Sequence, residues 1–174
     1  MDVFIEHIVK HRLQAKNIII MLAVAFSAMM ITLVAGVFFA VPAFRFFVLL
    51  IIAGAWYGAF WVVKSSYVEY EYTMTNSSID IDKIMGKSRR KRVISIDCHE
   101  VEICAAIDDS MHNGEFKSNA GISKVIDCTG YGDNDIYFLD IVNDKGKIRI
   151  LFEPKESMIE NAQKFNPRKI FKKN

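Results

Sequence analysis

The sequence predicts a membrane α-helical hairpin followed by an α+β, mainly β, domain with about seven antiparallel strands and a C-terminal helix. Two apolar runs support the hairpin: residues 18–41 and 46–63 contain no charged side chain, and only four residues separate them. Alternation of apolar and polar residues after position 65 supports the β domain. The 174 residues therefore divide into an amphipathic N-terminal segment 1–17, a hairpin 18–63 and a domain 64–174.

Each apolar run is long enough to cross a bilayer as a helix. The hydrocarbon core is about 30 Å thick and requires roughly 20 apolar residues in helical form. Strands or loops would leave backbone polar groups unpaired in lipid. The alternative, a buried helical pair in a soluble protein, is disfavoured because both runs are long and uncharged. A signal peptide is disfavoured because its apolar region spans only roughly 7–15 residues, and here a second run follows the first.

Positive charge predicts how the hairpin is oriented. Lys10, Arg12 and Lys16 precede the first run and Lys64 follows the second, whereas the connection contains only Arg45. Cationic flanks stay on the cytoplasmic side. We therefore expect a multi-pass protein of the inner (plasma) membrane with both termini in the cytoplasm. The Arg45 guanidinium would reach the outer headgroups while its aliphatic stem stays in lipid.

Small residues predict where the two helices contact each other. They recur at every fourth position in the first run and form a GxxxG pattern in the second, a spacing that permits close approach of helices. Packing within the hairpin is the expected role, and association of two copies is the alternative. The predicted packing positions are Ala28, Thr32, Gly36, Gly54 and Gly58.

The N-terminal segment is short and amphipathic. The segment mixes apolar residues such as Phe4 and Ile8 with charged ones such as Glu6 and Lys10, an amphipathic composition that predicts a helix lying on the inner leaflet. His7 and His11 are four residues apart, but a metal site would need further ligands and none is nearby. We predict no metal site here.

From Ser65 onward the apolar pattern has a period of two, which is typical of strands. Residues 108–121 are polar and predict a long loop, and Gly146 suits a hairpin turn. Pro154 suits the first turn of a helix that Asn166 and Pro167 end. The predicted strands are 67–75, 79–84, 90–97, 101–107, 122–128, 136–142 and 147–152.

This order of strands and helix, placed directly after two apolar spans, resembles the bacterial pleckstrin-homology-like (PH-like) domains of small membrane proteins. Segments 1–10, 70–76 and 79–84 also resemble an uncharacterised family of clostridial-type membrane proteins. The resemblance covers nearly the whole chain. Its motifs are structural, so it implies the architecture and assigns no catalytic or binding residues.

A basic cluster follows the second predicted strand, with five cations in six positions. Such a cluster beside a membrane span is typical of contact with anionic headgroups, at about 1 kcal/mol per cation near the surface. The alternatives are a specific headgroup pocket and a solvated edge that prevents strand pairing. Nucleic acid is not an expected partner because the net charge is only +2. The candidate lipid-binding residues are Lys87, Arg89, Arg90, Lys91 and Arg92.

Several apparent motifs do not meet their own requirements. Residues 86–88 resemble the end of a phosphate-binding loop, but that loop requires glycine where Ile81 stands. Residues 129–133 resemble a potassium-channel filter, which would have to lie between the two spans. The cysteines form no CxxC pair and are expected to be buried small hydrophobic residues; they are Cys98, Cys104 and Cys128.

These observations favour a binding protein over an enzyme. The first hypothesis is a membrane-anchored scaffold whose β domain docks an unidentified protein partner at a sheet edge or groove. The second is an anionic-lipid sensor that uses residues 87–92. A membrane enzyme or small transporter subunit is the third, and the near absence of polar groups in the spans disfavours it. We predict membrane lipids as partners, and no catalytic residue, cofactor or metal.

Overall fold

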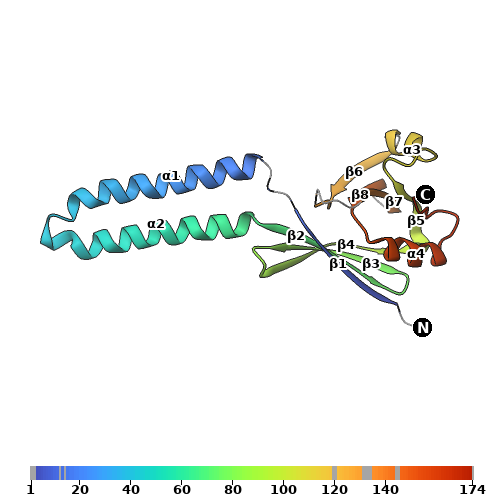
Figure 1. Ribbon diagram of the computed structural model, residues 1–174, viewed down its shortest axis with the longest axis horizontal. Coiled ribbons are helices and arrows are strands. Elements are labelled where there is room, and N and C mark those ends of the chain that lie inside the picture. The colour runs from blue at the N-terminus through green and yellow to red at the C-terminus, as the bar shows by residue number, and fades with distance from the viewer. Residues whose placement is uncertain are drawn as a thin grey trace. The chain divides into compact units, whose positions relative to one another are not determined.

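The computed structural model describes residues 3–11, 13, 15–118, 121–130, 135–143 and 146–173 (Figure 1). The chain divides into two compact units. One consists of residues 13–68 and 85–87, and the other of residues 1–12, 69–84 and 88–174.

The first unit contains the helical hairpin that the sequence predicts. Helix α1 (Ala15–Phe38) and helix α2 (Arg45–Ser66) lie side by side and are joined through a short 3-10 turn, η1 (Pro42–Phe44). Pro42 opens that turn, where its missing N–H leaves no hydrogen bond unmade. Both helices are long and apolar enough to cross a membrane.

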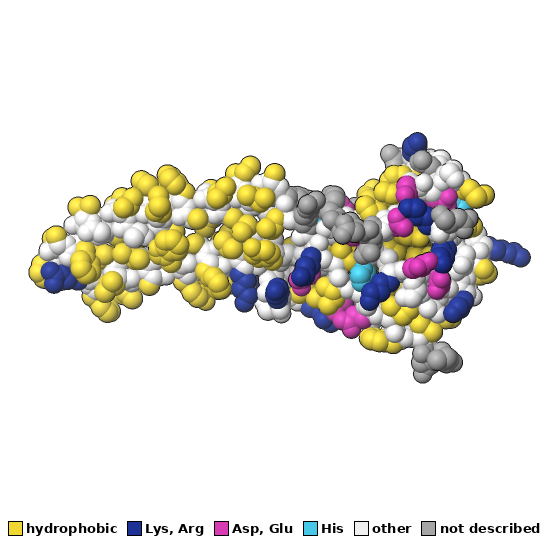
Figure 2. Space-filling view, in the orientation of Figure 1, with side chains coloured by type: hydrophobic (Ala, Val, Ile, Leu, Met, Phe, Trp, Pro, Cys, Tyr) yellow, Lys and Arg dark blue, Asp and Glu magenta, His cyan; other side chains and the backbone are white. Residues whose placement is uncertain are grey.

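Four small or branched side chains form the buried seam of the hairpin: Ala28 and Ala35 from α1, Val48 and Ala59 from α2. Thr32 adds a polar contact, because its hydroxyl oxygen accepts a hydrogen bond of 3.1 Å from the Trp56 indole N–H. Most other apolar side chains of both helices are exposed, as the yellow surface of Figure 2 shows. Such continuous apolar surface is expected of helices that contact lipid or another protein.

The structure separates the predicted packing residues into two groups. Ala28 and Thr32 lie in the seam. A Cβ atom added at Gly36, Gly54 or Gly58 would meet nothing within 4 Å, so these glycines do not bring the two helices together. The four-residue spacing identifies a helix face, but it does not show whether that face meets the other helix.

The second unit contains two sheets of four strands in its described residues. The first sheet has the order β1-β2-β3-β4. Its strands are β1 (Phe4–Lys10), β2 (Val68–Thr75), β3 (Ser78–Met85) and β4 (Arg89–Asp97).

The prediction of a surface helix for the N-terminal segment is wrong, because residues 4–10 form β1. This strand pairs with β2 in antiparallel register, from Phe4 opposite Thr75 to Lys10 opposite Glu69. Its more buried positions, Ile5, His7 and Val9, follow a period of two. The seven-residue pattern suits a strand as well as a helix, and its pairing partner lies beyond both helices in the sequence.

The second sheet has the order β5-β7-β8-β6. Strand β6 runs parallel to β8, whereas the other pairs are antiparallel, so the expectation of purely antiparallel strands needs correction. Alternation identifies each strand but not its neighbour or direction. The strands are β5 (Val101–Ala106), β6 (Ile122–Asp127), β7 (Tyr137–Asn143) and β8 (Gly146–Phe152).

Three helical segments accompany these sheets in the described residues. A short turn η2 (Cys98–Glu100) precedes β5, and α3 (Asn113–Lys117) lies inside the segment predicted to be a loop. The predicted C-terminal helix is confirmed as α4 (Glu156–Phe165), beginning just after Pro154. The last three residues of the apparent filter motif at 129–133 lie outside the described residues.

The core lies between the two sheets and under α4. Tyr72 and Phe152 meet edge to face with ring centroids 5.8 Å apart, and the Tyr72 hydroxyl donates a hydrogen bond of 2.7 Å to the Cys128 carbonyl. The prediction of buried cysteines is confirmed. Burial raises the pKa of the Cys98 thiol to about 11 and that of Cys128 to about 12, so both stay protonated near neutral pH.

The segment after α4 forms an additional short partner for β5. The Cys104 N–H donates to the Lys169 carbonyl and the Phe171 N–H donates to the Cys104 carbonyl, each at 2.8 Å. Ile170 between them is fully buried. Lys173 then forms ion pairs with Asp108 and Asp135. This C-terminal segment therefore belongs to the folded domain and is not a frayed tail.

Gly130 provides a test of how β1 is held. A Cβ atom at Gly130 would lie 1.9 Å from Cγ1 of Val9 and 2.8 Å from the Lys10 carbonyl oxygen. We expect Gly130→Ala to lower the free energy of unfolding by about 1–3 kcal/mol through overpacking. Urea unfolding of the full chain in detergent measures this. Gly114→Ala is the control, since a Cβ there meets nothing within 4 Å; equal effects of the two would contradict the packing of β1.

Candidate functional site

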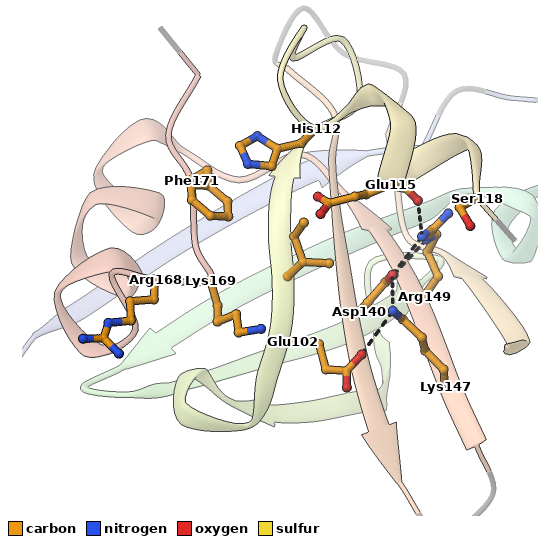
Figure 3. Close-up of a pocket in the computed structure, with 11 residues that line it drawn as sticks. Glu102, His112, Glu115, Ser118, Asp140, Lys147, Arg149, Arg168, Lys169 and Phe171 are labelled. Atoms are coloured by element: carbon orange, nitrogen blue, oxygen red, sulfur yellow. Dashed lines mark hydrogen bonds and ion pairs between the residues drawn. The ribbon is translucent and has the colours of Figure 1, made fainter. Parts of the chain in front are cut away.

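A pocket of about 360 Å³ opens on the second sheet (Figure 3). Its floor comes from three strands in direct register, with Ile103 of β5 opposite Asp140 of β7 and Asp140 opposite Arg149 of β8. One wall is α3 with its flanking residues, and the other is the C-terminal segment with Lys169 and Phe171. The sheet, α3 and the chain end thus meet at one place.

Arg149 connects the floor of the pocket to the α3 wall. Its Nε and Nη2 atoms each donate to a different Asp140 carboxylate oxygen at 2.8 Å, which is the bidentate geometry of a strong Arg–carboxylate pair. The same guanidinium donates to the Phe116 carbonyl, and to the Glu115 carbonyl at 3.0 Å. Only 4 % of the Arg149 side chain is exposed. Arg149 therefore fixes α3 to the sheet and is fully occupied in doing so.

Lys147 adds a second cation beside Asp140. Its Nζ atom lies 3.1 Å from the Glu102 carboxylate and 3.4 Å from that of Asp140. Partial burial lowers the pKa of Lys147, but hydrogen bonds to Glu102 and Asp140 outweigh this and raise the pKa above its ordinary value. Lys147 thus remains charged at the edge of the pocket.

His112 and Phe171 hold the two walls together. Their rings stack with centroids 4.0 Å apart and an interplanar angle of 23°. His112 also forms a hydrogen bond of 2.6 Å through Nδ1 to the Asp109 carboxylate. That bond, together with one from the Met111 N–H, lowers the pKa of Asp109. The mouth of the pocket is therefore built by contacts between distant parts of the chain.

Some charged side chains of the pocket form no ion pair with other parts of the described chain. Within the described residues, Arg168, Lys169 and the Glu115 carboxylate take part in no ion pair. Figure 3 shows the Lys169 ammonium extending toward the pocket and Arg168 pointing away from it. Four cations and three carboxylates line the pocket, which gives a net charge of +1. Such a lining suits polar or anionic groups of a partner.

The pocket residues were not predicted, although the sequence holds a signal for them. Asp140 stands in the otherwise apolar stretch YFLDIV, and Arg149 stands in IRILF. A charged residue inside an apolar strand requires a partner when buried. Among all the residues that the structure describes, no group of three or more His, Cys, Asp or Glu side chains could hold a metal ion.

The four cations of the basic cluster that lie on β4 alternate between its two faces, and Lys87 precedes the strand. Arg90 lies 2.9 Å from the Glu71 carboxylate, and Arg92 lies 2.9 Å from Asp82 and 3.2 Å from Asp80. Burial and a hydrogen bond to Glu6 raise the pKa of Glu71, and Arg90 opposes this shift. Arg90 and Arg92 are therefore ion-paired with acidic side chains of β2 and β3, although both side chains remain largely exposed.

All five cations of the cluster are exposed, and the remaining three differ from Arg90 and Arg92 in their pairing. Lys87, Arg89 and Lys91 form no ion pair within the described part of the chain, and Arg89 and Lys91 alternate with the paired arginines along the strand. The sequence prediction treated the five cations as one group. The alternating acids of the two preceding strands are the signal that Arg90 and Arg92 would be ion-paired.

Lys87 lies in a tight turn that is attached to the end of α2. Gly86 and Lys87 have φ angles of +57° and +58°, and the Gly86 N–H donates a hydrogen bond of 2.8 Å to the Tyr67 carbonyl. A Cβ atom at Gly86 would lie 3.0 Å from the Lys64 carbonyl oxygen, so glycine permits this close approach. The turn therefore places Lys87 in the same unit as Lys64, the basic residue in the last turn of α2.

Arg149→Met tests whether the buried ion pair supports the pocket. The substitution leaves the Asp140 carboxylate without its main partner and releases α3, so we expect a loss of about 3–5 kcal/mol in unfolding free energy. Hydrogen exchange should also accelerate in residues 113–117. Asp140→Leu combined with Arg149→Met should cost less than the sum of the single changes, because it removes the unpaired charge. An additive result would refute the coupling.

Comparison with known families identifies the family of this chain. The model of a family described as "Bacterial PH-like domain (DUF6106)" matches residues 1–172. Curated proteins and solved structures give no match. The family match includes the N-terminal strand, both helices, the two sheets and α4. The resemblance noted from the sequence is thereby confirmed, and the chain belongs to the bacterial PH-like domain family.

Proposed function

We propose that this protein is a membrane-anchored binding or scaffold protein whose PH-like domain docks a protein partner on the cytoplasmic side of the plasma membrane. Membership of a PH-like family supports a binding role. The observation that carries the proposal is the pocket beside α3, where Lys169 and Glu115 remain unpaired within the described residues around a rigid floor. Preorganised charged groups of this kind favour specific docking over general adhesion.

The apolar hairpin supports the membrane anchor. Its side chains are largely exposed on both helices, and the seam between the helices buries few of them. In water this surface would be costly, whereas lipid tails would cover it. Basic residues at 10, 16 and 64 favour the cytoplasmic side for the open end of the hairpin. Both termini then lie in the cytoplasm, together with the PH-like domain.

Charge reversal in the pocket tests the docking function. The tagged full-length protein is purified in mild detergent, washed at high salt, and its bound proteins are quantified. We expect a stoichiometric partner that Lys169→Glu combined with Glu115→Lys reduces by about tenfold or more, because the charge pattern facing the partner is inverted. Lys124→Glu, on exposed β6, is the control. Retention of the same partner by the pocket variant would exclude this pocket as the docking site.

A second candidate function, contact with anionic lipid, is favoured by the free face of the basic cluster. Lys87 belongs to the unit that contains the end of α2. Arg89 and Lys91 follow Lys87 closely, because even a fully extended chain from residue 87 to residue 91 spans at most about 14 Å. Three cations near a surface contribute about 1 kcal/mol each. Arg90 and Arg92 contribute less because acidic side chains already pair with them.

A fluorescent reporter next to the cluster tests the lipid contact. Because the three native cysteines are buried, Ser88→Cys gives one accessible labelling site in the full chain. In nanodiscs we expect an emission shift with phosphatidylglycerol but not phosphatidylcholine, lost at high salt. Neutralising Lys87, Arg89 and Lys91 to Gln should abolish the shift. Neutralising Lys117, Lys124 and Lys164 removes the same charge elsewhere and should preserve it; equal losses would indicate only a general charge effect.

A further inference from the structure

The η1 end of the helical hairpin has an apolar groove. One part has a volume of about 370 Å³ and an adjoining part about 220 Å³. Ala35, Phe38 and Ile51 line both parts, so the groove is continuous from the middle of α1 to the start of α2. Every lining residue is apolar; the others are Met30, Ile31, Val34, Phe44, Phe47 and Val48.

A charged residue, Arg45, follows the groove-lining Phe44 at the η1 end of the hairpin. Arg45 is the only charge between Lys16 and Lys64, and it directly follows Phe44 in the groove wall. Its Nε atom donates a hydrogen bond of 3.2 Å to the Phe39 carbonyl, and its guanidinium carbon lies 5.7 Å from the Phe39 ring centroid. These contacts orient the guanidinium. Within the described residues, its two terminal amino groups meet no carboxylate.

The start of α2 adds a second preference for an anion at the same place. Helix α2 continues directly from η1, where the Phe44 N–H donates to the Val41 carbonyl and the Arg45 N–H donates to the Pro42 carbonyl. The first turn of α2 contains no acidic residue. The positive end of the dipole of this helix lies at η1, and it favours negatively charged groups. Phosphate groups bind such helix ends in many proteins.

We propose that the η1 end of the hairpin binds one phospholipid, with its phosphate on Arg45 and the start of α2 and an acyl chain in the groove. An anion site and a wholly apolar groove that adjoin each other match the two halves of this molecule. A free inorganic anion would leave the groove empty, and a neutral hydrocarbon would leave Arg45 unneutralised. The proposal rests on the proposed membrane location of the hairpin.

The test uses the full-length chain, delipidated in dodecyl maltoside and titrated with palmitoyl-oleoyl-phosphatidylglycerol under native mass spectrometry. We expect a first phospholipid to bind distinctly more tightly than later ones. Arg45→Gln should weaken this first event about tenfold, because charge-assisted hydrogen bonds to the phosphate are lost. Arg45→Lys should restore part of the loss.

A matched pair of variants tests the groove. Ile51→Trp places a large ring in both parts of the groove, whereas Leu50→Trp places the ring outside it. The native Ile51 and Leu50 are similarly exposed, at 54 % and 55 %. Because neither is buried in the seam, both variants should keep the hairpin. We expect only Ile51→Trp to weaken the first phospholipid.

The outcomes separate this inference from the proposed function. Unchanged binding in Arg45→Gln, or equal effects of the two Trp variants, would overturn the phospholipid site while leaving the anchor intact. Recovery of the chain in the soluble fraction of cells, without membranes, would instead overturn the membrane anchor. Tight first binding that depends on both Arg45 and Ile51 supports the site.

Discussion

Pairing of β1 with β2 is the constraint on which the rest of the architecture depends. These two strands are neighbours in the sheet, and the whole helical hairpin is inserted between them in the sequence. Adjacent strands lie about 4.8 Å apart, so the two chain segments that enter and leave the hairpin begin from neighbouring positions. The hairpin meets this requirement with two antiparallel helices that pack against each other. The Ala28, Ala35, Val48 and Ala59 seam provides that packing.

The second sheet depends on a different interaction, the buried Arg149–Asp140 pair. A bidentate pair inside a sheet is a weak source of stability on its own, since both charges have left water. Its value here is positional: the guanidinium donors left over from Asp140 bind two carbonyls of the α3 segment. The C-terminal segment is tied to the same region by backbone hydrogen bonds to β5 and by the His112–Phe171 stack. Binding groups such as Lys169 are thus carried on a frame that the fold has already fixed.

The sequence is sufficient for features determined by local pattern. The two spans, the strands with regular alternation and the helix between Pro154 and Pro167 all depend on residues that are close in the chain. Features determined by distant partners could not be predicted. The segment at 4–10 becomes a strand because β2 offers it an edge, and β6 lies parallel to β8 because of the path taken by the chain between strands. The site follows the same division: the basic cluster is visible as a run, whereas its separation into paired and free cations depends on acids in β2 and β3.

The insertion of the hairpin between β1 and β2 also has a consequence for synthesis of the protein. Translation makes β1 before β2, and β2 emerges only after about 60 further residues, which takes roughly 3–12 s at about 5–20 residues per second. During that interval β1 is a short strand without its native neighbour. Glu6 and Lys10 place opposite charges on it, which hinders pairing with other chains. A ribosome-bound fragment that ends before β2 therefore contains β1 without its partner strand, and the first sheet can close only after both helices have been synthesised.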